Sequence, residues 1–76
     1  MSTRAYILID TIPGTARDVA IGLSSISGVS QVALITGPYD IVAMLETEDL
    51  VAIGDLVAGR IHAIRGVVRT QTCFVI

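Results

Sequence analysis

Lysine and tryptophan are missing from this 76-residue sequence, and cysteine and histidine each occur once. The five basic residues are all arginines, and seven acidic residues bring the formal net charge to −2 at pH 7. A domain that binds nucleic acid needs a basic face, so this charge balance argues against direct nucleic-acid binding. No apolar run approaches the roughly 20 residues of a membrane span, which argues against a membrane protein.

The single cysteine, Cys73, excludes a disulfide within the chain and fits a reducing compartment. The N-terminal residues also lack the basic and apolar regions of a signal peptide, so a cytoplasmic location is expected. Cys73 lies in an apolar stretch with no neighbouring base. It is therefore expected to be a buried, unreactive thiol.

The single histidine, His62, has no cysteine or second histidine with which to form a metal set. It falls near the end of a predicted helix, where the helix dipole favours a cation. No serine is accompanied by a histidine in a nucleophile pattern, the glycines form no phosphate loop, and the acidic residues are scattered. The sequence therefore predicts no enzyme, no cofactor and no metal.

The apolar content is high for so short a chain. Hydrophobic residues make up 53% of the sequence, and the mean hydropathy is +0.78. A domain of this length buries only roughly 60% of its unfolded surface, so it is marginally stable alone. The surplus indicates a second burial surface, and hence a homo-oligomer.

The apolar periodicity predicts one domain, residues 1–76, built from two strand–helix–strand units. Both units end their helix with the pattern I-x-G-V, at Gly28 and at Gly66. Strands are expected at Thr3–Asp10, Val29–Thr36, Ile41–Thr47 and Val67–Ile76, with one helix from the Pro13 turn to about Ile26 and another capped by Thr47. The buried stripe of the second helix is expected to comprise Leu50, Ile53, Leu56, Val57, Ile61 and Ile64.

Right-handed crossovers and antiparallel joining of the two units give an α+β, ferredoxin-like βαββαβ sandwich. Both helices cover one face of the sheet. The other face is left bare although its side chains are still apolar. A second copy of the sheet is the expected cover, as in dimeric α/β-barrel proteins.

Two polar features interrupt the apolar pattern. The tetrapeptide Gly37-Pro38-Tyr39-Asp40 joins two strands as a hairpin, yet it also carries a phenol and a carboxylate. Thr70 and Thr72 point to one side of the last strand, because side chains alternate along a strand. Each feature has a simpler interpretation: the tetrapeptide can be only a turn, and the two threonines can be present only because threonine favours strands. Together, however, these groups suit a zwitterionic ligand, since hydroxyls both donate and accept hydrogen bonds.

In this order the motifs resemble the effector-binding RAM domain of the Lrp/AsnC family of transcription regulators. The resemblance spans essentially the whole chain. It rests on Ile12-Pro13-Gly14, Gly28-Val29, the stretch from Val32 to Thr36, the G-x-Y-D loop Gly37–Asp40, Gly66-Val67 and the pair Thr70-x-Thr72.

The resemblance implies a homodimer that associates into higher oligomers and binds a small effector, usually an amino acid, between dimers. Gly37 and Tyr39 would supply backbone donors and a wall, Asp40 would pair with or orient an ammonium group, and Thr70 and Thr72 would bind polar groups. Pro38 in the x position of the G-x-Y-D loop is a departure that matters, because proline lacks a backbone N–H and so removes one donor near the expected carboxylate site.

Full-length members carry an N-terminal helix-turn-helix, whereas this sequence starts at the first strand. We therefore expect a stand-alone member without DNA binding, whose partner would be a helix-turn-helix paralogue that shares the dimer surface. Three other interpretations remain open: a ligand-free assembly module, a small dimeric α/β-barrel enzyme, and an amino-acid-binding ACT domain, which shares the topology.

Overall fold

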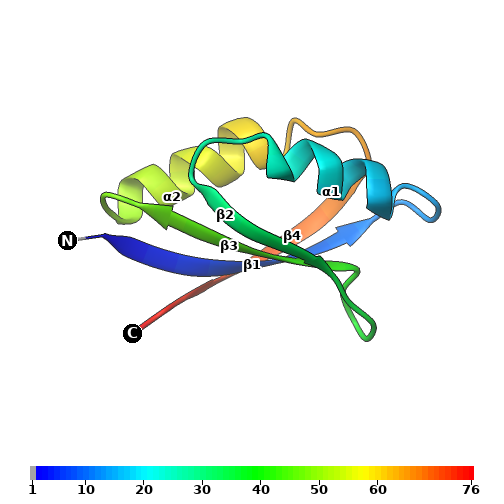
Figure 1. Ribbon diagram of the computed structural model, residues 1–76, viewed down its shortest axis with the longest axis horizontal. Helices are drawn as coiled ribbons and strands as arrows, with labels where there is room; N and C mark the ends of the chain where they lie inside the picture. The colour runs from blue at the N-terminus through cyan, green and yellow to red at the C-terminus, as the bar shows by residue number, and fades with distance from the viewer. Residues whose placement is uncertain (1) are drawn as a thin grey trace.

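The computed structural model describes residues 2–76 and contains a four-stranded antiparallel sheet with the strand order β2-β3-β1-β4 (Figure 1). The helical segments lie together on one side of the sheet. This arrangement confirms the expected ferredoxin-like sandwich. The elements are β1 (Thr3–Thr11), α1 (Ala16–Ser24), β2 (Val29–Leu34), β3 (Ile41–Thr47), α2 (Leu50–Leu56), the π-helix η1 (Val57–Ile61) and β4 (Val67–Phe74).

The core lies between the sheet and the helices. Alternate residues of the two central strands point into it, and the buried stripes of α1, α2 and η1 close it from above. Each fully buried Leu or Ile contributes about 1.5–3 kcal/mol relative to an exposed one. The largest side chains without solvent exposure are Ile7, Ile9, Val19, Leu23, Ile41, Leu45, Ile53 and Ile61.

Both predicted helix stops adopt a left-handed backbone, Gly28 with φ 99° and Gly66 with φ 106°. Neighbouring side chains also lie close to both glycines. A Cβ atom on Gly66 would lie 2.8 Å from Thr15 Oγ1 and 2.9 Å from Val19 Cγ2, and one on Gly28 would lie 2.7 Å from Leu56 Cδ1. Glycine is thus favoured at both junctions by its conformation, and at Gly66 also by packing against Thr15 and Val19.

The second helix differs from its prediction at its start. Asp49, not Thr47, is the N-cap, and its side chain accepts a hydrogen bond from the Ala52 backbone N–H. The Thr47 hydroxyl instead donates to the Asp49 carbonyl oxygen. Because the helix begins two residues later than expected, Leu50 falls in its first turn and is 59% exposed rather than buried.

The same helix widens at its other end. The His62 backbone N–H donates to the Val57 carbonyl oxygen, five residues back, which is the bond of a π turn. Residues five apart can then share a side, so Leu56 and Ile61 are both buried, although ordinary helical spacing would separate them.

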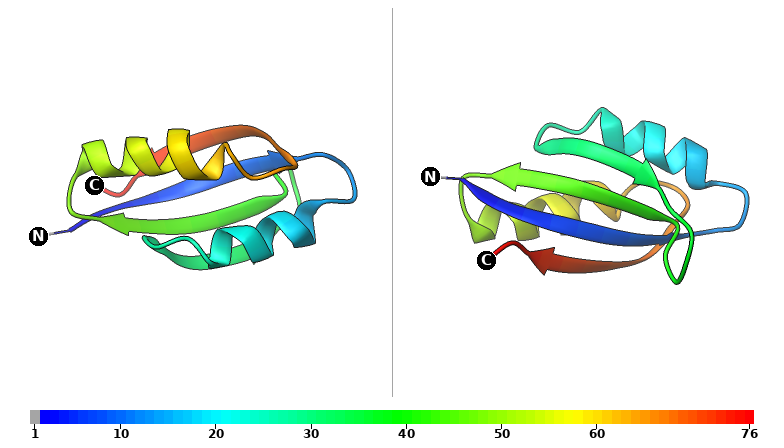
Figure 2. Two further views of the ribbon diagram at one scale, coloured as in Figure 1. Left: turned by 90° about the horizontal axis from the view of Figure 1, so that it is seen from above. Right: turned by 60° about the horizontal axis from the view of Figure 1, so that its bottom comes forward.

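Within residues 2–76, the face of the sheet opposite the helices carries no other segment (Figure 2); we call it the open face. Its centre is formed by Tyr6, Leu8, Val42 and Met44, and Tyr6 is 44% exposed. Cys73 also lies there, paired with Tyr6 across the strands, and its thiol is exposed rather than buried as expected. The reason is that β4 is an edge strand whose open side nothing covers.

Both outer strands end earlier than predicted. β2 ends at Leu34 and β4 ends at Phe74. The next residues each keep one backbone bond, from the Ile35 N–H to the Asp40 carbonyl oxygen and from the Val75 N–H to the Arg4 carbonyl oxygen. Among residues 2–76, no helix combines the length and the apolar character needed to cross a membrane.

Candidate functional site

The β2–β3 hairpin, the first predicted site element, bends at its tip toward the open side of the sheet (Figure 1). The Ile35 backbone N–H donates to the Asp40 carbonyl oxygen and closes the loop. Gly37 adopts φ 117°, which a residue with a side chain would adopt only with strain. Gly37 and Pro38 are both exposed at the tip.

The Asp40 carboxylate is engaged within the fold. Its Oδ2 atom accepts a hydrogen bond from the Thr11 backbone N–H at 2.8 Å and another from the Thr11 hydroxyl at 3.0 Å. Thr11 is only 9% exposed, so these bonds are shielded from water. Asp40 therefore fixes the base of the hairpin against the end of β1. One carboxylate oxygen is committed to that task.

Tyr39 fixes the tip of the hairpin from the other direction. Its hydroxyl donates to Gln71 Oε1 on β4 at 2.7 Å. The Arg69 guanidinium lies over the Tyr39 ring, 5.4 Å from its centroid, and also pairs with Asp10 Oδ2 at 2.7 Å. These contacts hold the tyrosine on the open face, across the end of β1 and β4.

Thr70 and Thr72 lie on the opposite face. In the β1–β4 ladder they pair with Ile9 and Ile7, whose side chains are buried beneath the helices. Gln71, between them, pairs with Leu8 and points to the open side. The two threonines thus share one side, as the alternation predicted. Within one chain, however, they are separated from Tyr39 by the thickness of the sheet.

The threonine side of β4 meets the end of η1. His62 Nε2 lies 3.0 Å from the Thr70 hydroxyl oxygen. Both threonines are partly buried, whereas His62 is exposed. We call His62, Thr70 and Thr72 the threonine cluster. It presents three groups that can exchange hydrogen bonds with a polar ligand.

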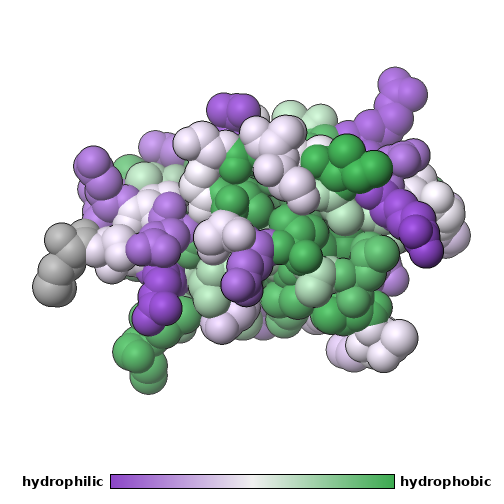
Figure 3. All heavy atoms as spheres, viewed as in Figure 1, coloured by the Kyte–Doolittle hydropathy of each residue, from purple (hydrophilic) through white to green (hydrophobic). Residues whose placement is uncertain are grey.

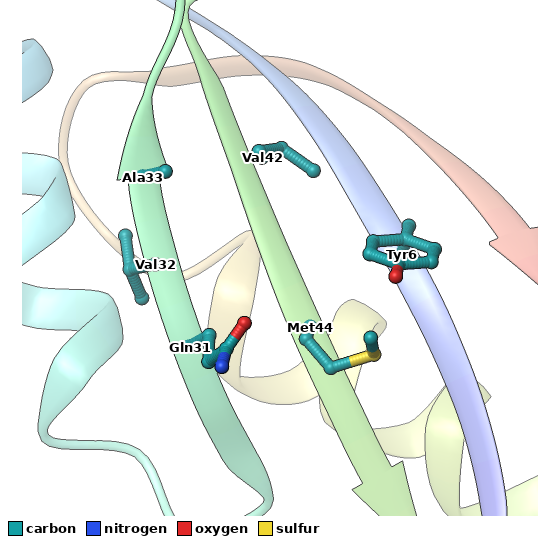
Figure 4. Close-up of a pocket in the computed structure, with 6 residues that line it drawn as sticks. All are labelled: Tyr6, Gln31, Val32, Ala33, Val42 and Met44. Atoms are coloured by element: carbon teal, nitrogen blue, oxygen red, sulfur yellow. The ribbon is translucent and has the colours of Figure 1, made fainter.

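A hollow of about 280 Å³ lies elsewhere on the open face, between β1, β2 and β3 (Figure 4). None of the predicted site residues lines it. Apolar side chains also gather over β2 toward the hairpin (Figure 3). The hollow is lined by Tyr6, Gln31, Val32, Ala33, Val42 and Met44. With one amide among mainly apolar side chains, it is suited to receive an apolar side chain of another molecule.

Sequence reasoning missed four residues that surround the predicted ones. Thr11 and Gln71 bind Asp40 and Tyr39, Arg69 covers the tyrosine ring, and His62 meets Thr70. The partners of the hairpin are distant in sequence, and Tyr39 and Gln71 are 32 positions apart. Only the strand register brings them together, so local patterns carry no signal for them. Within residues 2–76, no three His, Cys, Asp or Glu residues are grouped so that they could hold a metal ion.

The βαββαβ fold is that of a RAM-type ligand-binding domain. Residues 4–76 match the family model described as Lrp/AsnC ligand binding domain. An uncharacterised HTH-type transcriptional regulator of Pyrococcus horikoshii is 35% identical over 75 residues, which are 95% of this chain and 50% of that protein. The chain belongs to the Lrp/AsnC family. It spans about half the length of the curated relatives it matches.

Solved structures agree on the fold. The protein TTHA0845 from Thermus thermophilus superposes with a TM-score of 0.92 at 28% identity, over 97% of this chain and 92% of that one. The transcriptional regulator NMB0573 from Neisseria meningitidis, solved as an L-Met complex, gives a TM-score of 0.87 at 22% identity over 97% of this chain and 49% of that one. At 22% identity, this similarity shows the fold alone.

Proposed function

We propose that this domain binds an amino acid effector and couples its binding to oligomerisation, as part of transcription regulation. The observation that carries the proposal is the division of the polar groups in one chain. Tyr39 of the hairpin lies toward the open side, where it bonds Gln71, and the threonine cluster lies on the other side. A ligand that uses both sets must therefore lie between two copies of the chain.

The first level of assembly is the open face. It presents Tyr6, Leu8, Val42 and Met44 with polar residues toward its ends, and a second copy of the same face is its best cover. A twofold axis would place the apolar centres opposite one another. Dimers formed in this way would leave the hairpins and threonine clusters at their periphery, where a further dimer can meet them.

The chemistry of the two sets is complementary for a zwitterion. The hairpin tip offers backbone N–H groups at Gly37 and Tyr39, whereas Pro38 offers none. Asp40 keeps Oδ1 for an ammonium group while Oδ2 binds Thr11. Thr70 and Thr72 supply hydroxyls from the other copy. A ligand that favours one oligomer shifts the equilibrium toward it.

Titration calorimetry against the protein amino acids tests ligand binding, with L-methionine first because of the regulator solved as an L-Met complex. We expect saturable binding of at least one amino acid. The double variant T70V/T72V is expected to lose it, whereas Thr3→Val, at the far end of β1, is the matched control and should keep it. If no amino acid of the panel binds detectably at millimolar concentration, the proposal is overturned.

Mixed oligomers test whether the site is shared. Tyr39→Ala damages the hairpin half, and T70V/T72V damages the threonine half. Each variant alone should bind no effector. After unfolding and refolding together, subunits of the two kinds can form some sites from two intact halves, so part of the binding should return. A mixture that stays inactive, although mass spectrometry shows mixed oligomers, contradicts a shared site.

The proposal includes a cytoplasmic location, and a helix-turn-helix relative that shares the open face as a regulated partner. The relative from Pyrococcus horikoshii supports the second point, because it carries the matching region in a protein about twice as long. The role assigned here is binding, not catalysis. It is supported by the match of residues 4–76 to a ligand-binding domain.

A further inference from the structure

His62 is the one histidine of the chain, and the π turn of η1 sets its position. The i→i+5 bond between the His62 N–H and the Val57 carbonyl oxygen closes a last turn that holds one residue more than an α-helical turn. The imidazole then reaches β4, where Nε2 lies 3.0 Å from the Thr70 hydroxyl oxygen. Single π turns inside helices are frequent at functional sites.

The surroundings of His62 supply no ion-pair partner among residues 2–76. The charged side chains on its own segment are Asp55, Arg60 and Arg65, while Arg69 and Asp10 pair with one another on the open side. Arg17 and Asp18 lie on α1 and are both exposed. Among residues 2–76 the Arg69–Asp10 contact is the sole ion pair, so no carboxylate lies within ion-pair distance of the imidazole.

The tautomer and the protonation state of His62 together decide what the Thr70 hydroxyl can do. With a proton on Nδ1 alone, Nε2 accepts the Thr70 O–H, and the hydroxyl proton is occupied. With protons on both nitrogens, Nε2–H donates to the Thr70 oxygen, and the hydroxyl proton is free to bind a ligand oxygen. The neutral tautomer with its proton on Nε2 also donates to Thr70, so what protonation adds from either tautomer is a positive charge beside Thr70, which favours an anionic group.

We propose that His62 is a specificity-determining residue of the effector site and makes the threonine cluster the proton-dependent binding site for the α-carboxylate of the effector. The inference rests on the proposed function and deepens it. The threonine side then binds the carboxylate, while the hairpin of the other copy, with Asp40 Oδ1, binds the ammonium group.

The consequence is a dependence of affinity on pH. Histidine is the side chain whose ordinary charge change falls between about pH 5 and pH 8. A free amino acid keeps both of its charges over that range. Binding should therefore be tighter at about pH 5.5 than at about pH 7.5, by roughly tenfold, as expected when the hydrogen-bonding cluster beside the carboxylate gains one positive charge.

Calorimetry of the intact protein tests this with the amino acid that binds in the panel, taken first as L-methionine. Titrations in two buffers with different ionisation enthalpies reveal whether the protein takes up a proton when it binds. We expect fractional proton uptake and tighter binding at the lower pH. Because the chain holds one histidine, its imidazole Cε1–H resonance reports the same event without any substitution.

Two changes separate His62 from other titrating groups. In His62→Gln the amide can still donate to Thr70 or accept from it, but it carries no charge, so the pH dependence should vanish while the folded state remains. Arg60→Gln removes a neighbouring charge and should keep the dependence. L-methioninol, which lacks the carboxylate, should bind the unchanged protein equally at both pH values.

The outcomes are distinct from those of the proposed function. If an amino acid binds with equal affinity and no proton uptake at both pH values, the role of His62 is overturned while effector binding stands. The same holds if His62→Gln retains the pH dependence. If no amino acid of the panel binds at either pH, the proposed function fails and this inference fails with it.

Discussion

Asp40 accepts two hydrogen bonds from Thr11 on the same oxygen, one from the backbone N–H at 2.8 Å and one from the hydroxyl at 3.0 Å. This contact joins the base of the β2–β3 hairpin to the end of β1. It makes the aspartate of the G-x-Y-D loop a structural anchor. Any contact of Asp40 with an effector has to be made by the carboxylate while the anchor stays in place.

Asp40→Ala removes the acceptor and leaves the Thr11 N–H, which is nearly buried, without a partner. The free energy of unfolding should fall by about 1–3 kcal/mol, the cost of an unsatisfied polar group. Asp40→Asn keeps one side-chain oxygen and should cost less. Urea unfolding at one fixed protomer concentration measures the difference. Equal stability of Asp40→Ala and the unchanged protein contradicts the anchoring role.

Tyr39→Phe removes the hydroxyl that donates to Gln71, and Gln71→Ala removes the acceptor. Each change should cost about 0.5–1.5 kcal/mol or less, because the bond is exposed. It should also speed hydrogen exchange of the amides in residues 37–40. The double variant should exchange no faster than either single variant. Additive effects would show that the two side chains act independently.

Gly66→Ala forces a side chain into a left-handed backbone position and against Thr15 and Val19. We expect a loss of about 2 kcal/mol or more, from strain and overpacking together. Gly54→Ala is the control, because Gly54 lies in α2 with open space around it. That change should stabilise the helix by about 0.5–1 kcal/mol. Thermal unfolding of both variants provides the comparison.

Met44→Arg places a charge in the centre of the open face, which the proposed dimer buries. The mass measured by analytical ultracentrifugation should fall to that of a single chain at micromolar concentration. Ile21→Arg is the matched control, because Ile21 is 70% exposed on α1, on the other side of the molecule. Its mass should not change. A Met44→Arg protein that keeps its oligomeric mass excludes the open face as the interface.

The sequence predicted the fold because its signals were local and consistent. Helical and alternating apolar patterns marked the elements, and glycine marked both helix ends, where the structure requires a left-handed residue. The errors arose where tertiary packing decides. The late start of α2 moved Leu50 to the surface, and the lack of a cover over β4 exposed Cys73.

The candidate site was predictable only in part. Alternation placed Thr70 and Thr72 on one side of their strand, but it could not tell which side, because that depends on the register with Ile9 and Ile7. The bonds of Tyr39 and Asp40 depend on the same long-range register. The contact between His62 and Thr70 further requires a π turn, for which the sequence carried no recognised signal.

Thr70 and Gln71 are neighbours on β4, yet they serve opposite surfaces of the protein. Removing or adding one residue upstream in this strand would exchange the row of side chains that faces the helices with the row that faces the open side. The hydroxyls would move to the open face, and the amide would move under the helices. A bulge can absorb such a change, as between Asp10 and Thr11, where β4 carries one residue more than β1. Without a bulge, each row of side chains keeps its side of the sheet only if the strand changes length in steps of two residues.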